Sequence, residues 1–96
     1  MAMATRRRQR AERVLGSIPK LRILRALARG GEALSRYEVK RLSGVNYPEV
    51  SRHLNELVEL GLVRKLDYTD PERYVLNLED DAARLLVELF RKLDYL

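Results

Sequence analysis

Two helix-start signals stand close together in the middle of the chain, and a glycine separates them. Ser35 is followed three residues later by Glu38, and Asn46 is followed at the same spacing by Glu49. In such a capping box the first side chain accepts a hydrogen bond from a helical amide, while the glutamate bonds back to the capping residue. Gly44 ends the first helix, since glycine readily adopts the left-handed backbone found beyond helix ends. The pattern predicts two helices joined by a turn of about three residues.

We expect the first of these helices to cover about 36–42 and the second about 46–60. Two helices around a short turn with a glycine form a helix-turn-helix. The apolar residues of the pair recur at helical spacing and are expected to be buried, together with the valine of the turn. They are Val39, Leu42, Val45, Val50, Leu54 and Leu57. The polar face of the second helix is then exposed.

A helix is expected before this pair and a hairpin after it. Ser17 and Pro19 are start signals for a helix that ends at Gly30 and carries arginines along its exposed face. Residues 62–68 and 73–78 are rich in β-branched and aromatic residues and flank a turn, which predicts a β-hairpin. The expected fold class is therefore mainly α with a small β-hairpin (α+β).

The chain closes with a predicted helix that has two apolar lines. Its acidic start at 79–81 is favourable to the helix dipole. One line includes Leu86, Leu89 and Leu93, and the other includes Val87 and Phe90. Because one line is enough to dock the helix on its own domain, the second indicates a partner helix. We therefore expect a homodimer through this helix, with these five residues at the interface.

Composition excludes several classes of function. The 96 residues suit one compact domain, and the absence of cysteine with a single histidine excludes thiolate and multi-histidine metal sites. No apolar run is long enough for a membrane span, and the N-terminus lacks the apolar core of a secretory signal, so we expect a cytoplasmic protein. We expect no metal, no other cofactor, no membrane partner and no enzymatic activity, because His53 has no nucleophile or orienting acid at a useful spacing.

The net charge of +5 is concentrated at the N-terminus. Residues 1–30 carry nine arginine or lysine residues against one glutamate, whereas 31–96 carry ten against thirteen acidic residues. The balance favours a polyanionic partner. The arginine-rich start is either disordered or a short helix, and it is either a solvated tail or a nucleic-acid-binding arm.

The order helix, helix-turn-helix, hairpin, helix resembles the winged helix-turn-helix domains of ArsR- and MarR-type transcriptional regulators. The resemblance rests on the sequence Val-Ser-Arg-His-Leu at 50–54 and Gly-Leu-Val at 61–63. The stretch LRILRALARGG is also similar to the first helix of ArsR-type domains. Those metal sensors commonly bind metal through cysteines, so the resemblance is to an ArsR-like regulator without that site.

The resemblance implies a sequence-specific regulator that binds double-stranded DNA as a homodimer, in the cytoplasm and on the nucleoid. Its recognition helix, 46–60, would enter the major groove, and the hairpin would be the wing. The chain then divides into a basic arm or helix at 1–16, a winged helix-turn-helix domain at 17–78 and a dimerisation helix at 79–96.

The exposed residues at the start of the predicted recognition helix have the chemistry to read DNA. They are Tyr47, Pro48, Ser51, Arg52 and Asn55. Arginine bonds bidentately to guanine and asparagine to adenine, whereas serine holds a phosphate. Arg52 has a plainer interpretation as a solvated charge paired with Glu56, and Tyr47 as a residue packed on the turn. His53 is expected to be packed and hydrogen-bonded, and Glu49 to be a cap.

The predicted wing departs from the family pattern, because its tip at 67–72 is acidic. Its candidate phosphate contacts are Arg64 and Lys65 at the base and Arg73 beyond the tip. The arm is the alternative source of phosphate contacts, through Arg6, Arg7, Arg8 and Arg10.

Two other functions remain open. A protein–protein interaction module is favoured by the acidic wing and by the acidic balance of 31–96. A non-specific nucleoid or architectural DNA-binding protein is favoured by the arginine arm.

Overall fold

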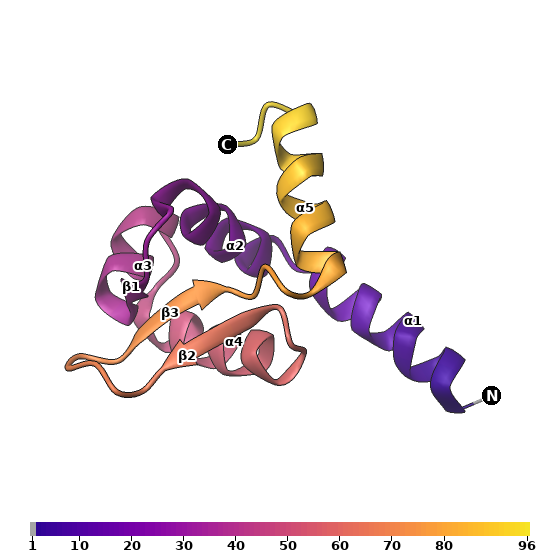
Figure 1. The fold of residues 1–96 in the computed structure, drawn as a ribbon, viewed down its shortest axis with the longest axis horizontal. Coiled ribbons are helices and arrows are strands. Elements are labelled where there is room, and N and C mark those ends of the chain that lie inside the picture. Colours follow the sequence, from indigo (N-terminus) through magenta and orange to yellow (C-terminus); the bar gives the residue numbers. More distant parts are fainter. Residues whose placement is uncertain (1) are drawn as a thin grey trace.

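The computed structural model describes the chain from residue 2 to residue 96, and its side chains from residue 8 onward. Over these residues the fold is mainly α with a small antiparallel sheet, as expected (Figure 1). The elements are α1 (Ala2–Leu15), α2 (Ile18–Gly30), β1 (Leu34–Ser35), α3 (Arg36–Ser43), α4 (Tyr47–Glu59), β2 (Val63–Leu66), β3 (Arg73–Leu76) and α5 (Asp81–Lys92).

Local hydrogen bonds set the boundaries of α3 and α4. Ser35 Oγ accepts from the Glu38 amide at 3.2 Å, and Glu38 Oε1 accepts from the Ser35 amide at 3.0 Å, which closes the predicted capping box. Gly44 follows α3 with a left-handed φ of 74°. Asn46 Oδ1 then accepts from the Glu49 amide at 3.0 Å and starts α4. The helix-turn-helix predicted from the caps is confirmed.

The sheet has one more strand than the predicted hairpin, in the order β1-β3-β2. β1 pairs with β3 with Leu34 opposite Tyr74, while β2 pairs with β3 on its other side. A two-residue strand is too short to show alternation in the sequence. The two long strands are shorter than expected, so Tyr68 lies in the exposed wing tip.

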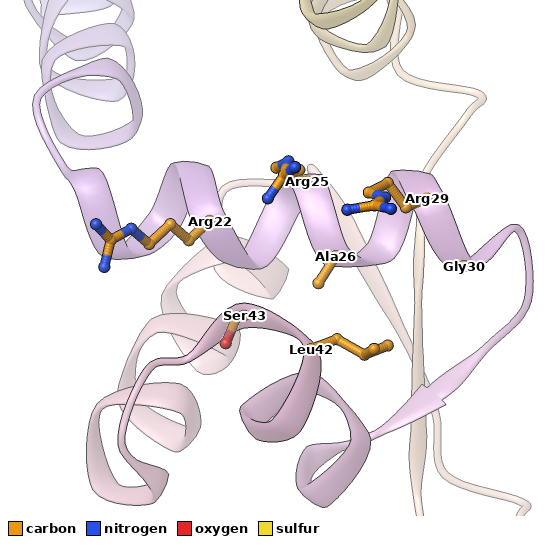
Figure 2. Close-up of a pocket in the computed structure, with 7 residues that line it drawn as sticks. All are labelled: Arg22, Arg25, Ala26, Arg29, Gly30, Leu42 and Ser43. Carbon is orange, nitrogen blue, oxygen red and sulfur yellow. The ribbon is translucent and has the colours of Figure 1, made fainter. Parts of the chain in front are cut away.

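One core joins α2, α3, α4, the sheet and α5. Ile23, Val39, Val50, Leu54 and Leu57 are fully buried, and Val45 fills the angle of the turn as expected. The expectation for Leu42 is wrong, because this side chain is half-exposed and lies at the edge of the space between α2 and α3 (Figure 2).

The arginine-rich start is helical, which decides one of the open alternatives. Figure 1 shows α1 projecting from the body of the molecule. Arg10 Nε donates to the Leu60 carbonyl at 3.0 Å, and its Nη2 donates to the Asp80 carboxylate at 3.2 Å. These contacts anchor α1 at the C-terminal end of α4 and at the start of α5.

The α5 helix buries one apolar line against its own chain. Ala83 and Phe90 are buried, Phe90 at 5% exposure, and the Tyr95 ring packs edge-on against Phe90. Phe90 is therefore removed from the predicted dimer interface, since it belongs to the core of one chain. Val87 is half-buried against the same core.

A different line of α5 stays exposed. Leu89, and Leu93 directly after the helix, are exposed, together with Leu85, which belongs to neither predicted line. Leu85, Leu86 and Leu89 line a groove of about 340 Å³ between α5 and α1, with Val14 and Leu15 on its other wall.

Candidate nucleic-acid interface

The predicted reading residues gather on one face of α4. Tyr47, Pro48, Arg52 and Asn55 are exposed, and Ser51 is half-buried. The opposite face of the helix is held in the core by Val50, Leu54 and Leu57. α4 therefore presents a fixed polar face near its N-terminal end, the end that contacts base edges in helix-turn-helix proteins.

Arg52 is held by two carboxylates of its own helix. It donates to Glu49 Oε2, and its Nη1 lies 3.9 Å from Glu56 Oε1. The plainer interpretation of Arg52, a pair with Glu56, is thus present in the structure, but Glu49 is the closer partner. The hydrogen bond from Arg52 lowers the pKa of Glu49 below its ordinary value.

His53 is packed and hydrogen-bonded, as expected. The residue is 5% exposed, and its Nε2 lies 3.1 Å from Glu49 Oε2. Its Nδ1 has no hydrogen-bond partner, alone among the buried side-chain polar atoms of the described residues. The expectation for Glu49 needs correction in part. Its amide is capped by Asn46, but its carboxylate bonds Arg52 and His53.

Two of the three basic residues of the predicted wing are paired with carboxylates in the structure. Lys65 Nζ pairs with Glu72 at 2.7 Å, which raises the pKa of the lysine. Arg73 pairs with Glu38 at 3.0 Å. Arg64 is exposed, and no ion pair to it is found among the described residues. The predicted phosphate contacts of Lys65 and Arg73 thus compete with neighbouring carboxylates.

The arm divides into an anchored part and an outer part. Arg10 is occupied by Leu60 and Asp80, and Arg13 lies 3.6 Å from Glu56. Arg8 is exposed. The side chains of Arg6 and Arg7 lie outside the described residues. Arg10 is thus bonded within the chain, whereas Arg8 is exposed.

A second basic surface lies on α2, and we refer to Arg22, Arg25 and Arg29 as the α2 arginine face. These residues line a groove of about 270 Å³, together with Ala26 and Leu42, which lie between α2 and α3 (Figure 2). Arg25 donates to the Tyr95 carbonyl, and its guanidinium lies 5.1 Å from the centre of the Tyr95 ring. The sequence shows the spacing of these arginines but not the groove.

The α2 arginine face points away from α4. Lys20 reaches across to Glu56 of α4, with Nζ 2.7 Å from Oε2. At 3.6 residues per turn, Arg22 and Arg29 lie roughly 200° and 180° around the helix from Lys20. The arginines and the exposed face of α4 are therefore on different sides of the molecule.

Helices α2, α3 and α4 surround one core, a short turn precedes α4, and the β2–β3 hairpin follows α4 in the chain. These features define a winged helix-turn-helix protein. The family model described as the MarR family matches residues 17–71, more than half of the chain, and the chain belongs to this family. The MarR family is a family of DNA-binding transcription factors. The resemblance to ArsR-type regulators in particular is not confirmed. The comparisons with curated proteins and with solved structures gave no match.

Two further observations concern the described residues alone. No helix between residues 2 and 96 is long and apolar enough to cross a membrane. In the same part of the chain, no three histidine, aspartate or glutamate side chains gather as they would around a metal ion.

Proposed function

We propose that this chain is a sequence-specific transcriptional regulator that places α4 in the major groove of double-stranded DNA. The observation that carries the proposal is the fixed face of α4, which exposes Tyr47, Arg52 and Asn55. Arg52 reads guanine and Asn55 reads adenine, each through two hydrogen bonds, and each pairing contributes about 1–3 kcal/mol of discrimination. Such a protein acts in the cytoplasm, on the nucleoid.

Phosphate contacts come from the outer turns of α1 and from the base of the wing. Arg64 of β2 and Arg8 of α1 are both exposed. Contacts of this kind set the register of the protein on the duplex and supply sequence-independent affinity. The acidic wing tip makes a weaker contribution, because its carboxylates repel phosphate.

We further propose that two chains associate through α1 and α5. The groove between these helices is lined by Leu85, Leu89 and Leu15, all of which are exposed in the single chain. Burying them against a second copy removes apolar surface from water. A two-fold dimer then sets two α4 helices one DNA turn, about 34 Å, apart on a pseudo-palindromic site.

The test is fluorescence-anisotropy binding to the DNA flanking the protein's own coding region and to random duplex, across a salt series. We expect the wild type to prefer the flanking DNA and Arg52→Ala to erase that preference. Arg91→Ala is the matched control, because it removes the same charge from an exposed position on α5. Equal binding of both DNAs by the wild type would contradict sequence specificity.

The same series measures the contribution of the arm. A chain that lacks residues 1–8 retains Arg10 and its anchoring contacts. If Arg6, Arg7 and Arg8 each contact one phosphate, the log–log salt slope becomes shallower by about 2.7 per chain. An unchanged slope would show that the arm is a solvated segment.

The α2 arginine face favours a second candidate, a protein that bridges two duplexes. Because this face points away from α4, it is free to meet other DNA while α4 is bound. Arg22→Ala with Arg29→Ala would then abolish co-precipitation of two labelled duplexes and leave anisotropy with one duplex unchanged. Absence of any DNA binding at low salt would instead favour a protein–protein interaction module.

A further inference from the structure

Two capping boxes with the same spacing have different outcomes in this chain. At α3 the Glu38 carboxylate returns to the Ser35 amide at 3.0 Å. At α4 the Asn46 side chain makes its half of the box, but the Glu49 carboxylate lies against Arg52 and His53. Capping therefore does not explain where the Glu49 carboxylate lies.

One oxygen of Glu49 receives two side-chain donors. His53 Nε2 lies 3.1 Å from Oε2, and Arg52 donates to the same atom. His53 is buried and its Nδ1 has no partner. An ionised carboxylate oxygen can only accept hydrogen bonds, so His53 Nε2 is the donor to Glu49. The buried His53 ring thus orients the Glu49 carboxylate from the core side of α4.

Glu49 in turn restrains the longest side chain of the reading face. The Arg52 side chain is 58% exposed, and Glu49 and Glu56 hold its guanidinium at 3.9 Å or less. A side chain held before binding loses less conformational entropy when it meets its target. The two carboxylates also offset its charge, which weakens its attraction to any phosphate.

We infer that Glu49, oriented by His53, is a specificity-determining residue that positions Arg52 for guanine and reduces its binding to phosphate. The inference rests on the proposed function of α4 and goes beyond it by naming the residue that sets the ratio of specific to non-specific binding. A positioning residue of this kind acts in opposite directions on two DNAs. It strengthens binding to the cognate site and weakens binding to random duplex.

The experiment compares Glu49→Gln with wild type on the preferred duplex and on random duplex at one salt concentration. We expect cognate affinity to fall about tenfold, near the lower end of the range for a bidentate base contact. Random-duplex affinity rises about twofold or more, because one carboxylate no longer offsets Arg52. Glu59→Gln is the matched control, since Glu59 lies exposed on the same helix. It should leave the ratio of the two affinities unchanged.

A modified base locates the effect at the guanine contact. Replacing the guanine read by Arg52 with 7-deazaguanine removes the N7 acceptor. We expect this duplex to bind wild type several-fold more weakly and to bind Glu49→Gln with little further loss. His53→Gln, checked by thermal melting for an intact fold, is expected to lower the specificity ratio in the same direction as Glu49→Gln.

The outcomes separate this inference from the proposed function. If wild type prefers the cognate duplex and Glu49→Gln keeps the same ratio, the inference is overturned and the function stands. A change of equal size and direction on both DNAs also overturns it, because Glu49 would then act only through charge or helix stability. If wild type binds neither DNA, the proposed function fails and the inference fails with it.

Discussion

Lys20 carries its charge into the interface between α2 and α4. The residue is 5% exposed, and its Nζ lies 2.7 Å from Glu56 Oε2. Arg13 and Arg52 reach the same carboxylate group at 3.6 and 3.9 Å. Glu56 therefore joins α1, α2 and α4.

Removing the carboxylate of Glu56 is expected to destabilise the fold. Glu56→Gln leaves Lys20 buried without its counter-charge. Breaking a buried pair in this way costs about 3–5 kcal/mol, and we expect about 2 kcal/mol here because the glutamate keeps some exposure to water. Urea unfolding at pH 7 measures the change. Glu59→Gln, on the exposed side of α4, serves as the control, and an equal effect of both substitutions would contradict the role of Lys20.

The environments of some side chains could be predicted from the sequence, and those of others could not. The spacing in 50–54 predicts that Arg52 is exposed and that His53 is packed, because both follow from the helical period. The burial of Lys20 is not predictable in this way. A lysine in an amphipathic helix is normally solvated, and its partner is 36 residues away in the chain.

At the scale of elements, α5 has two apolar lines with different environments. Phe90 packs inside its own chain against Tyr95, whereas Leu85 and Leu89 remain exposed beside α1. The sequence shows Phe90 on one line and Leu89 on the other, but it does not single out Leu85. Which line turns inward depends on how α5 packs on the rest of the chain, where Ala83 and Phe90 join the core.

Substitutions on the two lines are expected to separate folding from assembly. Phe90→Ala removes a core ring and should lower the free energy of unfolding by about 3–5 kcal/mol. Leu85→Glu should leave that free energy nearly unchanged and dissociate the proposed dimer, because it places a charge on the exposed line. Sedimentation velocity at micromolar concentration measures the mass.

Leu78→Glu is the control for assembly, since Leu78 is also exposed but does not line the groove between α1 and α5. A wild type that sediments as a monomer, or a Leu85→Glu variant that stays dimeric, would contradict association through this groove.

At the scale of the whole molecule, glutamates in ion pairs and caps link the elements and make stability depend on pH. The glutamates with lowered pKa are Glu38, Glu49, Glu56 and Glu72. The leading cause is a hydrogen bond from the Ser35 amide for Glu38, and from Arg52, Lys20 and Lys65 for the others.

Because these pKa values are lower in the folded chain than their ordinary value of 4.5, the ionised forms favour folding. Their contribution is present above pH 4.5 and is lost as the pH falls through the lower folded values. We expect the midpoint of urea unfolding to decline steadily below about pH 4.5 and to decline less in Glu56→Gln. A midpoint that stays constant from pH 6 to pH 3 would contradict this.

The sequence by itself determined the helix-turn-helix. Ser35, Gly44 and Asn46 mark its limits because each acts on backbone groups only three or four residues away. The reading face of α4 is also predictable from the local sequence. The helical spacing of the apolar residues places Val50 and Leu54 on the buried face, and Arg52 and Asn55 on the exposed face. Hydrogen bonds of such short range are visible in the order of the residues.

Only the tertiary structure decided which charges are available and which apolar line is exposed. Arg10 meets Leu60 across 50 residues of chain, and Arg73 meets Glu38 across 35, so both arginines are occupied within the molecule. Contacts of this kind depend on how the elements pack, and the local spacing of residues does not encode them.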